Sequence, residues 1–213
     1  TYVVNWQEMK ALHRAFLEAG VANQDIPQDH AFTAGVFRTA RKYGIKTILG
    51  GSNFATESIL PSAWGYDAMD RSHIMDIYRR FAPKGTRKLK SYPTLSFFDY
   101  YLFFPYIYRI RIERPLNYIP YSKTEAMTVL KRDLEWQYYG GKHHESRFTK
   151  FFQTYYLPTK WGYDKRRAHL ASMIHNGEVT RDEALAEMQQ PPFDSETIDQ
   201  DKEFFAKKLD LSM

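Results

Sequence analysis

A helix pattern, a short β-branched run and a glycine pair follow one another between Pro27 and Gly51. Pro27 is typical of a first helical turn and Gly44 of a helix end, so we expect a helix over residues 27–43. The run 45–49 (IKTIL) favours a strand that the glycine pair ends. Because a strand directly follows a helix, this segment predicts an α/β unit with a parallel strand.

The rest of the chain is predicted to be mainly helical. Apolar residues recur at helical spacing from Trp6 to Ala19, and the pattern ends at Gly20. Residues 95–112 (LSFFDYYLFFPYIYRIRI) predict a buried or interface helix that is kinked at Pro105. The other expected elements are helices over 70–81 and 199–209, helices begun by the capping boxes Ser122-x-x-Glu125 and Thr180-x-x-Glu183, and a short strand over 116–119.

The composition narrows the class of protein. A chain of 213 residues can bury a sizeable core as one domain, or as one domain with a small appendage. The absence of cysteine excludes disulfides and thiolate zinc sites and fits a reducing cytosol, so we expect a cytoplasmic protein. Residues 95–112 are too short and too charged to span a membrane comfortably. A peripheral membrane contact or a partner contact of that segment stays open.

One block, residues 139–170, carries the excess positive charge of the chain. Its acidic residues are Glu145 and Asp164, and its surplus of cations over acids equals the formal net charge of +5 of the whole chain. Such a concentration of charge among aromatic residues predicts a site for an anionic ligand. The basic residues of the block are Lys142, Arg147, Lys150, Lys160, Lys165, Arg166 and Arg167.

A glycine-rich segment, residues 50–57 (GGSNFATE), follows the predicted strand. Ligands of open α/β sheets bind beyond the carboxyl ends of the strands, where Ser52, Asn53 and Thr56 would offer hydrogen bonds. Glu57 is a candidate to hold Mg²⁺ or to orient a nucleotide. A tight turn with a polar helix cap explains the same residues, and the segment lacks the spacing of a Walker loop.

The second glycine segment is residues 140–146 (GGKHHES). Lys142 is expected to neutralise a phosphate, and His143 or His144 to donate to an oxyanion or to carry a proton. A solvated loop capped at Ser146 is the alternative interpretation. No metal site is predicted, because the His-His-Glu run lacks a second histidine one helical turn further on.

Residues 164–169 (DKRRAH) begin a predicted helix, with Asp164 as its N-cap. Arg166 and Arg167 are candidates to clamp a phosphate or a carboxylate. Cations at a helix start oppose the helix dipole, which favours an anionic partner there, although an exposed basic helix face is the alternative.

These runs together resemble the N-acetyl sugar amidotransferase family of bacterial surface-polysaccharide and nonulosonic-acid biosynthesis. The resemblance rests on GGSNFATES, LNYIPYSKTEA, YGGKHHESRFTKFFQTYYLPTKWGYDKRRAHLASMI and TRDEALAEM, and it covers nearly the whole chain. The family is related to the PP-loop ATP pyrophosphatases. The resemblance implies a helix-rich α/β fold, the C-terminal part of a PP-loop (adenine nucleotide alpha hydrolase-like) parallel-sheet domain with a helical extension. Residues 1–66 would belong to the nucleotide-binding domain, and residues 67–213 would form a mainly helical substrate and partner region.

The resemblance also implies a reaction. ATP, with Mg²⁺, activates the acetamido oxygen of a nucleotide-linked sugar, ammonia displaces AMP, and the group becomes acetamidino. The product would serve lipopolysaccharide, O-antigen or nonulosonic-acid biosynthesis. Ammonia is expected from a separate glutaminase paired with a cyclase-like subunit. Neither a nucleic-acid partner nor a membrane span is expected.

Site residues follow from the same resemblance, with individual roles inferred from residue type. Catalytic roles are expected for Lys142, His143 and Glu145. ATP binding is expected at Gly50, Gly51, Ser52, Asn53, Thr56 and Glu57. Substrate or phosphate binding is expected at His144, Arg147, Lys160, Asp164, Lys165, Arg166, Arg167 and His169.

The chain departs from the family in one respect: the PP-loop, a Ser-Gly-Gly-x-Asp-Ser pattern, does not occur in these 213 residues. In the family this loop lies upstream of the point that corresponds to Thr1, so we expect the chain to begin partway through a larger protein. Two other function classes stay open, a basic nucleic-acid-binding module and a non-catalytic scaffold that docks the glutaminase through residues 95–112. The leading hypothesis requires the two glycine segments to line one pocket.

Overall fold

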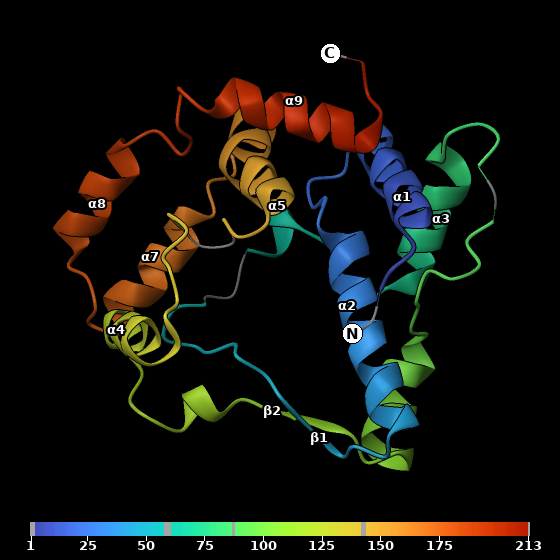
Figure 1. The fold of residues 1–213 in the computed structure, drawn as a ribbon, viewed down its shortest axis with the longest axis horizontal. Coiled ribbons are helices and arrows are strands. Elements are labelled where there is room, and N and C mark those ends of the chain that lie inside the picture. Colours follow the sequence, from blue (N-terminus) through green and yellow to red (C-terminus); the bar gives the residue numbers. More distant parts are fainter. Residues whose placement is uncertain (1–2, 58–60, 87, 142–143, 213) are drawn as a thin grey trace. The chain divides into compact units, whose positions relative to one another are not determined.

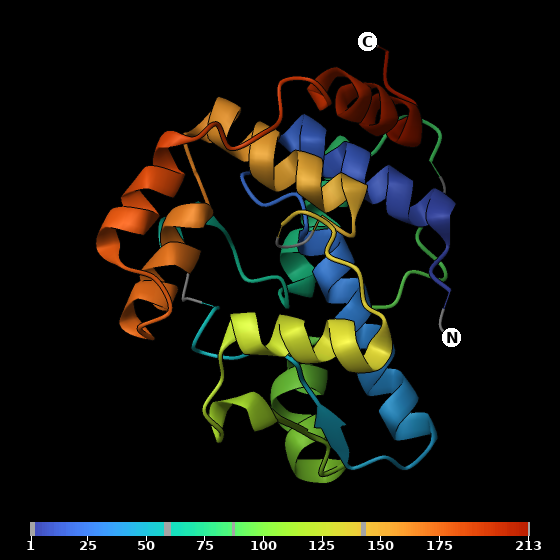
Figure 2. The same ribbon diagram turned by 60° about the vertical axis from the view of Figure 1, so that its left-hand side comes forward.

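The computed structural model describes residues 3–57, 61–86, 88–141 and 144–212, and it is rich in helices (Figures 1 and 2). The α-helices are α1 (Trp6–Ala19), α2 (Ile26–Lys42), α3 (Arg71–Phe81), α4 (Lys123–Leu134), α5 (Arg147–Phe151), α6 (Leu157–Trp161), α7 (Arg166–His175), α8 (Arg181–Gln189) and α9 (Ile198–Leu209). The strands are β1 (Thr47–Leu49) and β2 (Arg111–Glu113). The 3₁₀-helices are η1 (Ser62–Trp64) and η3 (Pro115–Asn117), and the π-helices are η2 (Asp99–Ile107) and η4 (Phe152–Tyr156).

The chain forms two compact units that are interleaved along the sequence. The first unit is Thr1–Ile48, Ser62–Glu113 and Ala206–Met213, and the second unit is Leu49–Pro61 and Arg114–Phe205. The predicted division was a single boundary between residues 66 and 67. It assigned nucleotide binding to residues 1–66 and substrate and partner binding to residues 67–213. That functional division stays a prediction.

The core of the first unit lies among α1, α2 and α3. Leu12, Phe16 and Ile74 are fully buried there. The predicted helix 6–19 is confirmed, since the Asn5 side chain accepts the first free N–H groups of α1 and Gly20 ends the helix in the left-handed region at φ 63°. The helix predicted over 70–81 is α3, and the Asp70 carboxylate caps it.

Two histidines are buried in this unit. His30 lies between two chain segments, because its Nδ1 is 2.8 Å from the Ala68 carbonyl oxygen and its Nε2 accepts the Leu95 N–H at 3.0 Å. Burial lowers the pKa of His30 and lowers the pKa of His13 to about 4. Both side chains are therefore neutral at pH 7. Through these two hydrogen bonds, His30 fixes the backbone of Ala68 and Leu95 to α2.

The sheet is small. β1 and β2 pair in parallel, and the Arg111 N–H donates to the Lys46 carbonyl oxygen at 3.0 Å. The strand predicted over 45–49 is confirmed in its second half, whereas β2 was not predicted. The strand predicted over 116–119 is wrong: Pro115 fixes φ and starts the turn η3, in which the Tyr118 N–H donates to the Pro115 carbonyl oxygen. A PP-loop domain remains an expectation.

Residues 95–112 form something other than the expected kinked, buried helix. The central part is the π-helix η2, with Pro105 inside it, and Phe104 is its buried residue, packed on Phe37 at a ring distance of 4.8 Å. Most other side chains of η2 are exposed, so of the expected buried or interface helix the buried alternative is wrong and the interface alternative stays a prediction. Among the described residues, the helices are too short or too polar to cross a bilayer.

The second unit consists of helices joined by short loops. The capping box predicted at Thr180 is confirmed in full, since Thr180 and Glu183 each accept the other's backbone N–H. Ser122 accepts the Glu125 N–H and so starts α4 as predicted. α5, η4 and α6 follow one another without a break, and α7 lies beside α8 in both views (Figures 1 and 2). Phe205 of α9 packs on α5 in the core of this unit.

Candidate functional site

The second unit contains two neighbouring cavities, of about 430 Å³ and 790 Å³, which share part of their walls. The smaller one, here the aromatic cavity, is lined by Thr56, Tyr121, Lys123, Trp136, Tyr138, Tyr139, Gly140, Gly141, His144, Gln153, Thr154, Asp164, Lys165, Arg166, His169, Leu170, Met173, Glu187 and Pro192. The larger one, here the polar cavity, is lined by Tyr139, Gly140, His144, Glu145, Arg147, Lys150, Thr154, Gln190, Pro191, Pro192, Phe193, Asp194, Ser195 and Asp201.

The structure brings the two glycine segments together at the aromatic cavity. Thr56 of the first segment and Gly140, Gly141 and His144 of the second line the same space. Thr56 is held by its own turn, because Asn53 Oδ1 accepts both the Thr56 N–H at 2.9 Å and the Thr56 hydroxyl at 3.1 Å. The sequence hypothesis required both glycine segments to line one pocket, and Thr56 is the residue of the first segment that does so.

The rest of the first segment forms the tight capped turn that was the alternative interpretation. Asn53 is buried, and the Ser52 hydroxyl accepts the Arg114 Nε–H at 2.9 Å. Gly50, Gly51, Ser52, Asn53 and Glu57 are not among the lining residues. Glu57 still lies near the cavity, because its charge acts on Tyr121, which lines it. Burial, the charge of Glu178 and the charge of Glu57 together raise the pKa of Tyr121. ATP binding by this segment stays a prediction.

The second glycine segment holds His144 against its own backbone. A Cβ atom at Gly141 would stand 2.5 Å from His144 Cε1, so a larger residue there would require this imidazole to shift. Gly140 lies in the left-handed region at φ 91° and so favours glycine as well. His144 consequently faces both cavities. Lys142 and His143, two of the expected catalytic residues, lie outside the described residues.

Arg166 is held by protein groups on all sides. Asp164 receives Arg166 Nη2 at 2.7 Å, while Arg166 Nη1 donates to the carbonyl oxygens of Glu187 and Gln190. Asp164 also accepts the Arg166 N–H, so it stabilises the start of α7 from two positions before the helix instead of acting as the N-cap, which is Lys165. Arg166 thus joins α7 to the end of α8, and phosphate binding by it stays a prediction.

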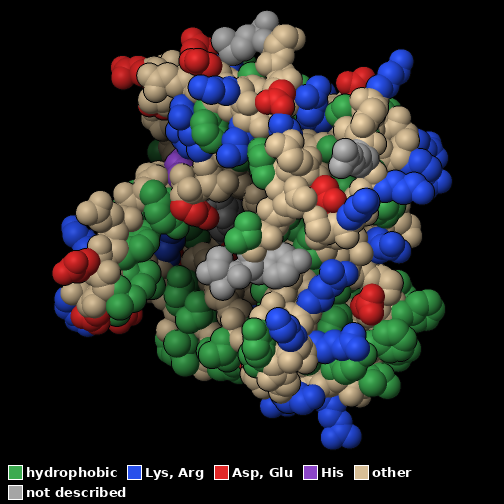
Figure 3. Space-filling model, turned by 45° about the vertical axis from the view of Figure 1, so that its right-hand side comes forward, with side chains coloured by type: hydrophobic (Ala, Val, Ile, Leu, Met, Phe, Trp, Pro, Cys, Tyr) green, Lys and Arg blue, Asp and Glu red, His purple; other side chains and the backbone are tan. Residues whose placement is uncertain are grey.

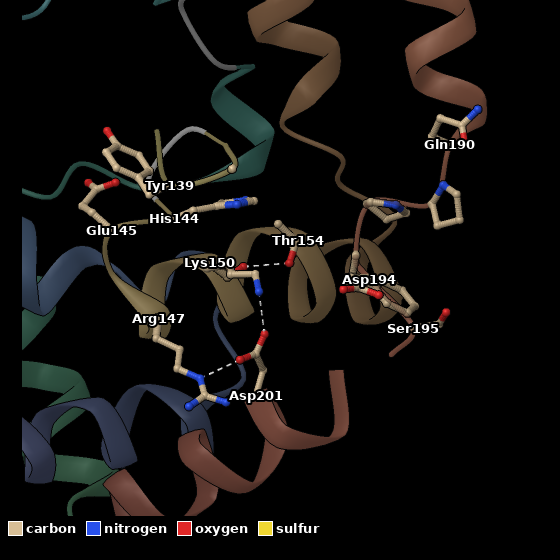
Figure 4. Close-up of a pocket in the computed structure, with 14 residues that line it drawn as sticks. Tyr139, His144, Glu145, Arg147, Lys150, Thr154, Gln190, Asp194, Ser195 and Asp201 are labelled. Atoms are coloured by element: carbon tan, nitrogen blue, oxygen red, sulfur yellow. Dashed lines mark hydrogen bonds and ion pairs between the residues drawn. The ribbon is translucent and has the colours of Figure 1, made fainter. Parts of the chain in front are cut away.

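The polar cavity is built around one buried carboxylate (Figure 4). Asp201 of α9 accepts Arg147 Nε at 2.6 Å and Lys150 Nζ at 3.0 Å, both from α5. Burial raises the pKa of Asp201, but these two hydrogen bonds outweigh it and hold the pKa below its usual value. Two cations of the basic block are therefore partly neutralised within the protein.

The remaining predicted residues divide into two groups. Lys165 and His169 line the aromatic cavity, and Glu145 lines the polar cavity. Lys160 and Arg167 are exposed and line neither cavity, and Lys160 donates to the Tyr156 hydroxyl at 2.9 Å. A catalytic role stays a prediction for Glu145, and roles in substrate or phosphate binding stay predictions for the other four.

Sequence reasoning missed Lys123 and the three aromatic residues that lead into the second glycine segment. Lys123 is the first residue of α4, its N–H donates to Glu178, and no carboxylate of the described chain lies within ion-pair distance of its amine. Trp136 packs edge-on against Tyr139, at a ring distance of 5.5 Å. The signal was available, since the Ser122 cap fixes Lys123 at a helix start and three aromatic rings precede the glycines.

The arrangement suits a ligand with a flat ring and an anionic group. Aromatic faces stack with planar rings, and Lys123 and Lys165 supply positive charge in the same cavity. Because several cations of the block are bonded to Asp164 and Asp201, the block is less of an open basic surface than its sequence indicates. Within the described residues no group of three potential ligands could hold a metal ion.

Comparison with known proteins finds a family match for the C-terminal third of the chain. Residues 145–213 match the family described as LPS biosynthesis protein WbpG-like, C-terminal domain. The matched segment runs from Glu145 through α5 to α9 and contains both partners of the Arg147–Asp201 ion pair. No curated protein and no solved structure matches the chain. The predicted resemblance to a surface-polysaccharide biosynthesis family is thus confirmed for this segment.

Proposed function

We propose that this chain, whose residues 145–213 match the WbpG-like C-terminal domain family of lipopolysaccharide biosynthesis, takes part in an ATP-dependent amidotransferase reaction. In that reaction the acetamido group of a nucleotide-linked sugar becomes an acetamidino group. A carbon–nitrogen bond forms as ammonia attacks, the activated carbon–oxygen bond breaks with AMP as the leaving group, and the nitrogen gives up a proton. A glutaminase with a cyclase-like subunit would supply the ammonia.

The observation that carries this proposal is the aromatic cavity. Two segments that lie far apart in the sequence, at Thr56 and at Gly140–Gly141, meet there beside a lysine whose charge no described carboxylate neutralises. A nucleotide-linked sugar combines a planar base, charged phosphates and a polar ring, and the cavity offers a matching group for each. The neighbouring polar cavity offers space for a second reactant.

Within this proposal the chain's own residues divide the work. Lys123 and Lys165 neutralise phosphate oxygens. The Thr56 hydroxyl donates its proton to Asn53, so it orients the ligand by accepting a hydrogen bond. His144 faces both cavities, so it is positioned to take the proton that the attacking nitrogen loses. Arg166 and Asp164 act indirectly, because they fix α7 and therefore Lys165 and His169.

ATP and Mg²⁺ are the proposed cofactors. With the nucleotide-linked sugar in the aromatic cavity, the adjoining polar cavity offers the space for ATP, and Glu145 and Arg147 line it. Mg²⁺ in such sites usually keeps several waters and binds phosphates with one or two carboxylates, so a cluster of three protein ligands is not required. When bound, ATP would supply the activation of the amide oxygen by transferring its AMP group, with the α–β phosphoanhydride bond broken and pyrophosphate as the leaving group.

The test compares two lysines of one helix, α4. Replacing Lys123 by Met removes the amine in the cavity, whereas Lys131→Met alters an exposed lysine near the other end of the helix. Titration calorimetry with UDP-N-acetylglucosamine should show binding at least tenfold weaker for K123M, since one charge-assisted phosphate contact contributes about 1.5–3 kcal/mol. K131M should bind like the unchanged protein.

Turnover is measured separately as AMP release with ammonium, ATP and the UDP-acetamido sugar, in the presence of the partner subunits. Equal affinity of K123M and the unchanged protein would refute the assignment of the cavity. Affinity for a generic oligonucleotide that falls steeply with salt, without affinity for UDP-N-acetylglucosamine, would favour the nucleic-acid-binding alternative instead.

A further inference from the structure

The first unit carries an exposed aromatic face on the π-helix η2 and the residues before it. Tyr106 is 71% exposed, Phe97 66% and Ile107 64%, values that apolar side chains of a folded core do not reach. Contiguous exposed apolar surface of this kind usually marks an interaction site. The aromatic face comprises Phe97, Phe98, Tyr101, Phe103, Tyr106 and Ile107.

The geometry of η2 explains why these side chains share one surface. In a π-helix the N–H of one residue bonds the carbonyl five positions back, as Tyr108 does to Phe103 at 2.8 Å. Side chains four or five positions apart therefore lie above one another, and the rings of Phe97 and Tyr101 are 4.8 Å apart. Phe104 points the other way and supplies the packing of η2 on Phe37, so the aromatic face is not needed for the core.

A cationic pocket of about 500 Å³ lies against the same helix. Arg38, Arg41 and Lys42 from the end of α2 line it, together with Asp99 and Phe104 of η2. The acid is already engaged, because Asp99 Oδ2 accepts the Ser96 N–H at 2.9 Å and the Ser96 hydroxyl at 2.7 Å. The pocket therefore has three positive side chains against one occupied carboxylate.

These three cations have no anionic partner among the described residues. Arg38 donates to the Thr94 carbonyl oxygen at 2.7 Å, and the Arg41 guanidinium lies 4.4 Å from the Tyr108 ring. The Lys42 amine lies 5.3 Å from the Tyr43 ring. The negative end of the α2 dipole offsets about half a charge, so most of the positive charge faces outward.

Cations of α2 and exposed aromatic side chains therefore border the same short helix. Figure 3 shows hydrophobic side chains gathered at the lower right of the molecule next to Lys and Arg side chains. Tyrosine and phenylalanine beside lysine and arginine are typical of the water–lipid boundary of a membrane, where rings sit at headgroup level and cations meet anionic lipid.

We propose that η2 and the cationic pocket bind the surface of a membrane that contains anionic phospholipid. The aromatic face enters the headgroup layer, and Arg38, Arg41 and Lys42 contact a lipid phosphate. Charge complementarity selects this partner, since the pocket carries a surplus of two positive charges and the acid within it is bonded internally. The chain contacts the surface from one side and does not enter the bilayer core.

The experiment is co-sedimentation of the full chain with vesicles of phosphatidylcholine, with or without about one third phosphatidylglycerol. Binding should require the anionic lipid and should weaken strongly between low and high salt. The Arg41→Gln variant should bind about fivefold more weakly, because one cation near an anionic surface contributes about that factor. The double variant Phe97→Ser, Tyr106→Ser should lose most binding.

Two variants of the same unit serve as controls. Phe32→Ser removes an exposed phenylalanine of α2, and Arg79→Gln removes an exposed arginine of α3 that pairs with Asp76. Both should sediment like the unchanged chain, and circular dichroism melts should show that all variants fold.

Three outcomes would overturn the proposal. One is equal binding to neutral and anionic vesicles. Another is equally tight binding of inorganic phosphate without vesicles, which would make the pocket a soluble-anion site. The third is a change of oligomeric state in the double variant with unchanged vesicle binding, which would make the aromatic face a contact between protein chains.

Discussion

Acid should destabilise the first unit through His13 of α1. This imidazole is 2% exposed. Burial lowers its pKa from 6.5 to about 4, although a hydrogen bond with the Gln24 backbone acts in the opposite direction. The folded protein therefore keeps His13 neutral at pH values at which the unfolded chain protonates it.

The sign and size of the effect follow from proton linkage. Above pH 6.5 neither state binds the proton, so the full stability is present, and it is lost as pH falls from 6.5 to about 4. The whole shift corresponds to about 3 kcal/mol of unfolding free energy, of which about 2 kcal/mol should be lost by pH 5.

The assay compares urea unfolding at pH 7.5 and pH 5.0, followed by circular dichroism. A His13→Gln variant should lose about 2 kcal/mol less over this interval than the unchanged chain, because the buried titrating group is gone. His30 contributes equally to both proteins and cancels.

Identical pH dependence of H13Q and the unchanged chain would refute this reasoning. An NMR titration of the His13 imidazole in the unchanged chain gives a second reading that needs no variant. A midpoint near pH 6.5 would contradict the same argument.

Three further variants test other parts of the structure. Asp201→Asn should lower the unfolding free energy by about 1–2 kcal/mol at pH 7, since it leaves two cations without their carboxylate, and urea unfolding measures this loss. Gly141→Ala should lower the rate of AMP release by about tenfold because its Cβ shifts His144 away from the position in which it takes the proton, whereas Gly65→Ala, where a Cβ meets only ordinary van der Waals contacts, should release AMP normally. Thr180→Ala should cost about 1 kcal/mol through loss of the capping box, and an unchanged melting midpoint would contradict that value.

Local signals in the sequence predicted the helices well. The apolar spacing from Trp6 and the stop at Gly20 give α1 with its observed bounds, and Thr180 with Glu183 gives the start of α8. Each of these signals acts within one or two helical turns, so a single sequence contains all the information that it needs.

The errors concern interactions between distant residues. β2 is three residues long, and its partner at Lys46 lies more than sixty residues earlier in the chain, so no local pattern marks it. The carbonyl groups that bind Arg166 come from the end of α8, and the acid that binds Arg147 comes from α9. Sequence reasoning could place cations in the block but could not identify which of them the protein neutralises itself.

The site was predicted in outline for the same reason. Gly140, Gly141 and Thr56 were expected at a ligand site because small and polar residues let a ligand approach the backbone and offer it hydrogen bonds. Lys123 was missed because a lysine at a helix start is ordinary, and its importance depends on Trp136 and Tyr138, which line the same cavity.

The interleaving of the two units means that no single cut yields either of them intact. The chain passes from one unit to the other at residues 48, 61, 113 and 205, and the last passage falls inside α9. Phe205 serves the core of one unit, while Leu209, four residues later, is completely buried in the other. The helix α9 therefore belongs to both units. Fraying of its last turn would first weaken the packing of α1, where Lys10 forms an ion pair with Asp210.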